Sequence, residues 1–218
     1  MSDERMARLA ELAQADRPEE RKRLATGLCD LLLDWPEGYP HQAREPFESL
    51  LEKTLRLIDR DTRLDLVARI AAAPGAPLGF LNEYYLEAPA GLRAAILARN
   101  GERRMQAARA SFDEAALVAA ARAATSGDFT LPFARALSIP TATAERILAD
   151  PDGEALAAAM RGAGASRAGF STLALIACGL HAPGRTLARL SAYERISPCA
   201  AENLLHFWRT HAPLTIAA

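Results

Sequence analysis

The chain has 218 residues, half of them hydrophobic, and a formal net charge of −1. A chain of this length buries roughly 70% of its unfolded surface, which makes a core possible without disulfides or a structural metal. The near-neutral charge argues against nucleic-acid binding, because nucleic-acid-binding domains usually concentrate lysine and arginine.

The first residues and the cysteines indicate the compartment. The chain opens MSDERMARLAEL, with charges where a secretory signal would be apolar. Its three cysteines, Cys29, Cys178 and Cys199, lie far apart. The longest stretch without charge, residues 168–184, is shorter than the ~20 apolar residues that span a bilayer. We therefore expect a cytoplasmic protein in a reducing compartment, with no membrane anchor.

Helical periodicity recurs along the whole chain, and strand signals are almost absent. Apolar residues from Leu24 to Trp35 follow one helix face, and Asp16 with Pro18 supplies a start. The turn WPEGYP ends this helix. Residues 47–58 repeat the pattern, and Asp61 is predicted to cap the helix that follows and that ends at APGAP.

Helix-end signals continue through the second half of the chain. Asn100 and Gly101 predict a left-handed C-cap, and Ser111 with Glu114 predicts a capping box that opens a helix over about 112–125. Further N-caps are expected at Thr141, Ser166 and Ser197. These signals predict roughly ten to twelve short helices.

The stretch ILADPDGEALAAAM, residues 147–160, gathers three acidic side chains around a turn. An EF-hand loop with Gly153 at its sixth position would end at Ala159, so the bidentate glutamate is missing. A helix start explains the stretch better. Asp150 is then the N-cap and Pro151 the first helical residue, with two more acids facing the positive end of the helix dipole.

Two stretches echo each other, LIDRDTRLDLVARIA and LADPDGEALAAAMRG, and each lies at a helix-turn-helix junction. Such junctions are similar to the joint inside HEAT-type repeats. The predicted fold is therefore all-α, with stacked antiparallel helix pairs in a HEAT-like α-solenoid or a multi-helix bundle. We expect one all-helical domain over residues 1–218, or two packed halves with a joint near 100–101.

Three segments carry a resemblance to a known family: REPFESLLEKTLRLIDRDTRLDLVARIAAAPGAPLGFLNEYYLEAPAGLRAAILARN, ILADPDGEALAAAMRGAGASRAGFSTLALIA and AAENLLHFWR. They resemble an uncharacterised family of HEAT-like all-helical proteins, found largely in alphaproteobacteria and catalogued as a domain of unknown function. The resemblance covers most of the chain from about residue 42 onward. It implies an all-helical cytoplasmic protein with a regulatory role, and it carries over no catalytic residues.

Cysteine and histidine offer two candidate sites. Cys178 and His181, with Cys199, His206 and His211, would make an irregularly spaced zinc set, and a core cysteine with a histidine at a helix end explains the first pair better. Cys199 could also pair with either later histidine as a nucleophile, but nothing distinguishes it from an ordinary cysteine at a helix start. Walker, dinucleotide and serine-elbow motifs are missing. We expect no metal, no cofactor and no catalytic residues.

Arginines around residue 100 make the sharpest basic group, opposed only by Glu102. They are Arg93, Arg99, Arg103, Arg104 and Arg109. A solvated helix face explains them, and the functional alternative is a site for an anion or an acidic partner, because the guanidinium binds carboxylate and phosphate bidentately.

The leading hypothesis is a non-enzymatic protein-protein interaction or regulatory module, because stacked helices build an extended binding surface without catalytic groups. Its partner is an unknown protein or a second copy of the chain. The alternative is a HEAT-like nucleic-acid-binding enzyme such as a DNA glycosylase. A sensor that encloses a small ligand or a lipid between its helices is a third possibility.

Overall fold

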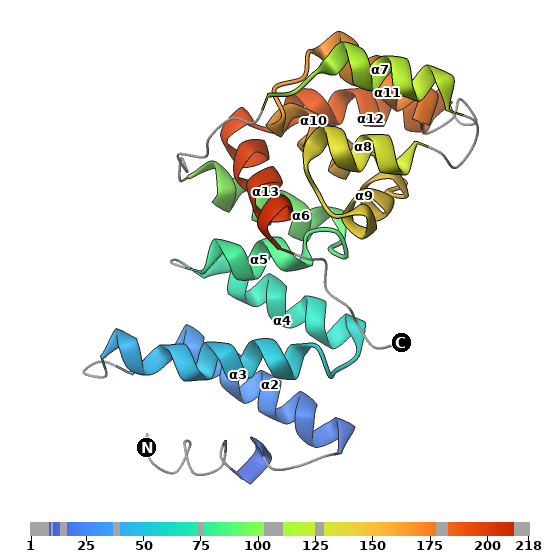
Figure 1. Cartoon of the computed structure of the whole chain (residues 1–218). Helices are drawn as coiled ribbons and strands as arrows, with labels where there is room; N and C mark the ends of the chain where they lie inside the picture. The colour runs from blue at the N-terminus through green and yellow to red at the C-terminus, as the bar shows by residue number, and fades with distance from the viewer. Residues whose placement is uncertain are drawn as a thin grey trace. The chain divides into compact units, whose positions relative to one another are not determined.

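The computed structural model describes residues 9, 11–13, 17–36, 40–73, 76–102, 111–124, 129–177 and 183–211. Regular structure in these residues is entirely helical, with twelve α-helices and one 3-10 helix (Figure 1). The predicted all-α fold of about ten to twelve helices is confirmed. Across the same ranges, no helix combines the length and the apolar character needed to cross a membrane.

The chain divides into two compact units. Unit 1 comprises Met1–Tyr84 with Thr215–Ala218, and unit 2 comprises Tyr85–Leu214. The boundary therefore falls after α5, and the expected joint near 100–101 lies inside unit 2.

Unit 1 is built from a few short helices around a leucine-rich core. They are α2 (Pro18–Leu33), the 3-10 helix η1 (His41–Arg44), α3 (Glu45–Leu55), α4 (Arg60–Ala72) and α5 (Leu78–Tyr84). α2 packs on both α3 and α4, and α4 packs on α5. The apolar face predicted on α2 is buried from Leu24 to Leu32, and α2 begins at Pro18, as expected. Asp16, the predicted start residue, lies outside the described residues.

Unit 2 is a bundle around one central helix. Its helices are α6 (Ala90–Gly101), α7 (Glu114–Ala123), α8 (Thr130–Leu137), α9 (Thr141–Leu148), α10 (Glu154–Gly162), α11 (Arg167–Ala177), α12 (Pro183–Arg195) and α13 (Pro198–Thr210). α10 packs against α9, α11, α12 and α13. Every residue from Ala155 to Met160 is buried, as expected for a helix that is apolar on all sides. Its alanines let the neighbouring helices approach closely.

Ser166 and Ser197 cap helices as predicted. The hydroxyl of Ser166 accepts a hydrogen bond from the backbone N–H of Gly169 at 3.0 Å. The hydroxyl of Ser197 accepts from the N–H of Ala200 at 3.1 Å, and Pro198 occupies the first residue of α13. Each side chain thus satisfies a backbone donor that the first helical turn leaves without a partner.

The predicted caps at Asp61 and Thr141 are wrong. Asp59 is the N-cap of α4, because its backbone is extended and its carboxylate accepts from the N–H of Thr62 at 3.0 Å. Asp61 already belongs to the first turn of the helix. Thr141 is the first residue of α9, and Pro140 precedes it as an N-cap without a side-chain hydrogen bond.

The capping box predicted at Ser111 is also wrong. Asp113 is the N-cap of α7 and accepts from the N–H of Ala116 at 2.9 Å, so the helix covers Glu114–Ala123. Glu114 bonds to a residue far along the chain instead. Its carboxylate accepts from the backbone N–H of Ser166 at 2.5 Å and from the Ser166 hydroxyl at 2.6 Å. This contact ties α7 to the start of α11.

Asn100 lies inside α6, where the sequence predicted a helix end. The residue is fully buried, and its side-chain amide donates to the carbonyl of Ile96 at 2.8 Å. Its own carbonyl accepts from the amide of Asn203 on α13 at 2.8 Å. Gly101 therefore remains part of α6 without a positive φ angle, and Glu102 follows it as a right-handed C-cap. The predicted left-handed cap is wrong.

Candidate functional site

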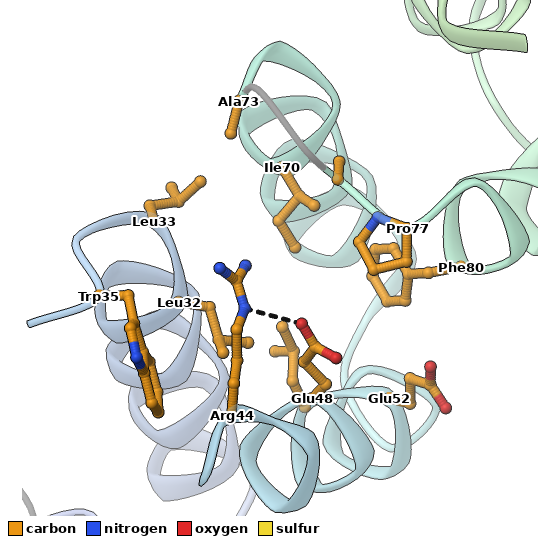
Figure 2. Close-up of a pocket in the computed structure, with 12 residues that line it drawn as sticks. Leu32, Leu33, Trp35, Arg44, Glu48, Glu52, Ile70, Ala73, Pro77 and Phe80 are labelled. Atoms are coloured by element: carbon orange, nitrogen blue, oxygen red, sulfur yellow. Dashed lines mark hydrogen bonds and ion pairs between the residues drawn. The ribbon is translucent and has the colours of Figure 1, made fainter. Parts of the chain in front are cut away.

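A pocket of about 220 Å³ lies in unit 1 among α2, α3, α4 and the start of α5 (Figure 2). Its wall is mainly apolar and includes Leu32, Leu33, Trp35, Ile70, Pro77 and Phe80. Ile70 is buried, whereas Leu33 keeps 37% of its surface exposed. We call this cavity the unit 1 pocket. It is an amphipathic hollow, with mostly apolar residues in its wall and an apolar side chain at its edge.

The ends of helices and the turns between them build this pocket. α2 ends with Leu32 and Leu33, and Trp35 follows in the turn. The ring of Trp35 packs edge-on against Phe47 of α3, with the ring centroids 5.9 Å apart, which holds the indole at the border of the pocket. α4 ends after Ala72, and Pro77 leads into α5. The turn residues predict where each of these helices ends or begins, but they do not predict that these ends come together around a pocket.

The charged side chains of the pocket belong to η1 and α3. Arg44 donates from Nε to Oε1 of Glu48 at 2.8 Å, and both side chains are partly exposed. Figure 2 shows the terminal nitrogens of Arg44 pointing toward the pocket. Glu52 also lines the pocket, and among the described residues no cation lies within ion-pair distance of it. Carboxylates therefore outnumber cations in the lining.

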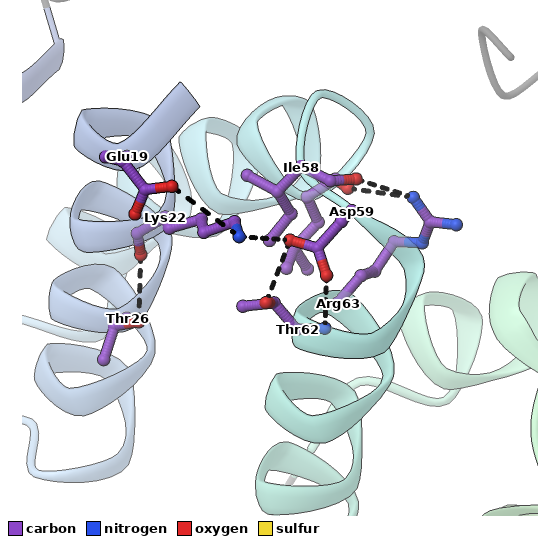
Figure 3. A network of polar contacts seen from close by, with 8 residues as sticks. Glu19, Lys22, Thr26, Ile58, Asp59, Thr62 and Arg63 are labelled. Atoms are coloured by element: carbon purple, nitrogen blue, oxygen red, sulfur yellow. Dashed lines mark hydrogen bonds and ion pairs between the residues drawn. The ribbon is translucent and has the colours of Figure 1, made fainter. Parts of the chain in front are cut away.

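A polar network joins α2 to the start of α4 in the same unit (Figure 3). The ammonium of Lys22 lies 2.9 Å from Oδ2 of Asp59. Hydrogen bonds from the backbone N–H of Thr62 and from Lys22 hold the pKa of Asp59 well below its ordinary value, and the hydrogen bond to Asp59 raises the pKa of Lys22. Arg63 donates to the carbonyl of Ile58 at 3.1 Å. These contacts position α4, whose far end forms the pocket wall.

Replacing Asp59 with asparagine should lower stability in a pH-dependent way. Because the pKa of Asp59 is lower in the folded state, its charge stabilises the fold above the ordinary aspartate pKa of about 3.9, and this contribution is lost as the pH falls toward the folded value. Urea midpoints of the wild type and Asp59→Asn should differ by a constant amount above about pH 5, and the difference should narrow progressively as the pH falls below about 4. Asp61→Asn is the control, and a gap that persists unchanged at acid pH contradicts this role.

Arg93 and Asp150 form a buried ion pair in unit 2. Nη1 of Arg93 lies 2.8 Å from Oδ1 of Asp150, and the two side chains are 10% and 2% exposed. Nε of Arg93 also donates to the carbonyl of Tyr85 at 3.2 Å. The second oxygen of Asp150 accepts from the N–H of Ala155 at 2.9 Å. Both oxygens of Asp150 therefore have donors from the protein, which leaves the pair a structural role.

The predicted helix start at Asp150 is wrong in position. α10 begins at Glu154, after Gly153, whose φ of 66° lies in the left-handed region that favours glycine. Pro151 and Asp152 form the turn before it. Asp150 still satisfies a donor of the first turn of α10, but from outside the helix. In the part of the chain that the structure describes, no group of three or more His, Cys, Asp or Glu could hold a metal ion.

Burial shifts the pKa of two side chains near the Arg93–Asp150 pair. Burial raises the pKa of Glu154 and that of the Tyr85 phenol. The hydroxyl of Tyr85 is buried and has no hydrogen-bond partner among the described residues. The Tyr85 ring instead packs against Arg93 and, edge-on, against Trp208 at 5.8 Å. These contacts belong to the core of unit 2.

Of the predicted arginine group, the structure describes Arg93 and Arg99. Arg93 is buried beside Asp150, whereas Arg99 is partly buried and pairs with Glu102 at 3.1 Å. Arg103, Arg104 and Arg109 lie outside the described residues. Arg93 is thus unavailable to a ligand, and an anion site on the remaining arginines stays a prediction.

The candidate cysteine-histidine pairs, which the sequence did not favour, are not assembled in α13. Cys199 lies near the carbonyl of Asn100 and the amide of Asn203. His206 is two turns further along the helix, about 10 Å away in rise alone. His211 follows the last turn and stacks on Phe207. Cys178 and His181 lie outside the described residues.

The fold and its pocket define an all-helical protein of two compact units, one of which holds an amphipathic hollow. No protein-family model, curated protein or solved structure matches the chain. The resemblance to the HEAT-like family therefore stays a prediction.

Proposed function

We propose that the protein is a protein-binding module and that the unit 1 pocket receives an apolar side chain of its partner. The observation that supports this most is the composition of the pocket, which combines an apolar wall with an aromatic ring at its border and a partly exposed leucine, Leu33. Aromatic residues are enriched where interfaces gain most of their binding energy. An apolar hollow with a polar rim is the arrangement that an inserted side chain requires.

The size of the pocket supports a side chain over a cofactor. Its volume of about 220 Å³ lies below the range of about 300–1,000 Å³ typical of sites for small molecules and cofactors. One or two side chains fill such a space. Among the described residues, the ionisable groups of the wall are Arg44, Glu48 and Glu52, and these residues supply neither a thiol or hydroxyl nucleophile nor a histidine base.

The glycosylase alternative finds less support. Such an enzyme needs a basic surface for the phosphate backbone. In the unit 1 pocket the carboxylates outnumber the arginine, and in unit 2 Arg93 is internal. We retain protein binding as the proposal.

Filling the pocket tests the proposal. Ala73 lines it, and the neighbouring Ala72 is exposed outside it, so Ala73→Trp fills the hollow and Ala72→Trp is the matched control. A displayed library of random 16-residue peptides is selected on the wild type. Selected peptides should bind Ala73→Trp at least about thirtyfold more weakly, because loss of an anchor costs about 2 kcal/mol or more. They should bind Ala72→Trp normally.

Two results would contradict the proposal. One is a library that yields no binders, and the other is a set of peptides that bind both tryptophan variants as tightly as the wild type. Urea unfolding of both variants checks that Ala73→Trp remains folded at the temperature of the binding assay.

A further inference from the structure

We infer that the partner segment is a cationic amphipathic helix, with an apolar residue seated in the unit 1 pocket and a lysine or arginine beside Glu48 and Glu52. This inference rests on the proposed function and adds the chemistry of the partner. Two observations support it: the charges that border the pocket, and the type of secondary structure that a groove between helices can bind.

The charge at the pocket favours a cation. Glu45, Glu48 and Glu52 are spaced i, i+3 and i+7 along α3, so they share one face of that helix. Figure 2 shows the carboxylates of Glu48 and Glu52 on the α3 side of the pocket. Arg44 compensates Glu48 alone, at 2.8 Å, and Glu52 has no ion-pair partner among the described residues. Like charges four residues apart repel each other, and a bound cation relieves that repulsion.

An anionic partner would bind less favourably at this pocket. Its carboxylate could approach the terminal nitrogens of Arg44, but that position is next to Glu48, which already holds Arg44 through Nε. The ligand would have to compete with Glu48 while being repelled by Glu52. A cation beside Glu52 meets a carboxylate that has no ion-pair partner among the described residues. Phe80 lines the same pocket, and the faces of aromatic rings attract cations.

Grooves between packed helices suit a helical partner. One way to bind an extended peptide is to add it as a strand to an exposed sheet edge, and the described residues contain no strand for this. A helix lays apolar anchors at i, i+3 or i+4, and i+7 into a groove between helices. Cationic residues three or four positions from the anchor then fall beside α3. An amphipathic helix thus supplies both the anchor and the cation.

The test compares two fluorescein-labelled 18-residue peptides that share a leucine face. One carries lysine at the flanking positions and the other carries glutamate. Fluorescence anisotropy with the full-length protein should show about tenfold tighter binding of the lysine peptide at low salt, and this preference should shrink as salt is added. Glu48→Gln with Glu52→Gln should abolish or invert the preference, because the double variant also releases Arg44.

The matched control is Asp61→Asn with Asp65→Asn, which changes the net charge equally on exposed positions of α4 outside the pocket. It should leave the preference unchanged. The single variant Glu52→Gln, which breaks no ion pair among the described residues, should lower lysine-peptide affinity about threefold.

The outcomes separate this inference from the proposed function. Tighter binding of the glutamate peptide, or a lysine preference equal in the Gln double variant, overturns the inference. If selected library peptides depend on Ala73 but neither contain lysine or arginine nor compete with the lysine peptide, protein binding stands and the cationic helix is wrong. If light scattering shows a dimer that Ala73→Trp dissociates, the occupant is a second copy of the chain and the inference is also wrong.

Discussion

Replacing Asp150 with alanine is expected to destabilise the protein by about 3–5 kcal/mol, because it leaves the charge of Arg93 uncompensated inside unit 2. The change also removes the acceptor of the Ala155 N–H in the first turn of α10. The first loss acts on the contact between α6 and the turn before α10, and the second acts on α10 itself. The free energy of unfolding from urea titrations, followed by circular dichroism, measures the effect.

Two further variants separate the cost of an unpaired charge from the value of the pair. Asp152→Ala changes an exposed acid of the same turn and should stay within about 0.5 kcal/mol of the wild type. Arg93→Met combined with Asp150→Ala should cost less than Asp150→Ala alone, because no buried charge then remains. A double variant less stable than the single one would contradict this explanation, as would an Asp150→Ala effect no larger than that of Asp152→Ala.

The second large effect is expected at Gly162, where α10 packs closely against α13. A β-carbon at this position would lie 2.4 Å from the carbonyl oxygen of Ala201 and 2.9 Å from Cβ of Leu205. Alanine is the better helix former by about 1 kcal/mol, but overpacking against backbone costs about 1–3 kcal/mol or more. We expect Gly162→Ala to destabilise the protein by about 2 kcal/mol, since a backbone oxygen cannot turn away as a side chain can.

Gly91 supplies the matched control. It is exposed near the start of α6, and a β-carbon there would meet nothing within 4 Å. Gly91→Ala should therefore raise the free energy of unfolding by about 0.4–1 kcal/mol, through lower entropy of the unfolded chain. Differential scanning calorimetry of the two variants should show melting temperatures that move in opposite directions. Movement of both in the same direction would show that helix propensity, and not the α10–α13 contact, determines the result.

Local signals in the sequence predicted the helices well. The apolar repeat from Leu24 onward became the buried face of α2, and Ser197 with Pro198 became the start of α13. Both depend on neighbours in the chain, where the geometry of a helical turn is enough. Asp59 and Asp61 show the limit of such signals. Both can cap a helix, and only the backbone angle at Asp59 decides which does.

Long-range contacts account for what the sequence did not predict. The carboxylate of Glu114 accepts hydrogen bonds from Ser166, the N-cap of α11, instead of completing a capping box of its own helix. Arg93 turns inward to Asp150 instead of facing solvent. Neither partner lies within one helical turn in sequence, so no spacing rule applies. The unit 1 pocket is of the same kind, because Leu33, Arg44 and Ile70 meet only after three segments have packed. Only the spacing of the glutamates within the segment REPFESLLEKTL is a local feature of the sequence that belongs to this pocket.

The two tryptophans allow a direct test of the central claim that the unit 1 pocket is the binding site. Trp35 borders the pocket, and Trp208 is buried in unit 2 against Tyr85. The indole N–H signals of a ¹⁵N-labelled sample are followed by NMR while the lysine peptide is added. The signal of Trp35 should shift until the protein is saturated, and that of Trp208 should stay in place. A peptide that binds while only the Trp208 signal moves, or neither, would contradict the claim.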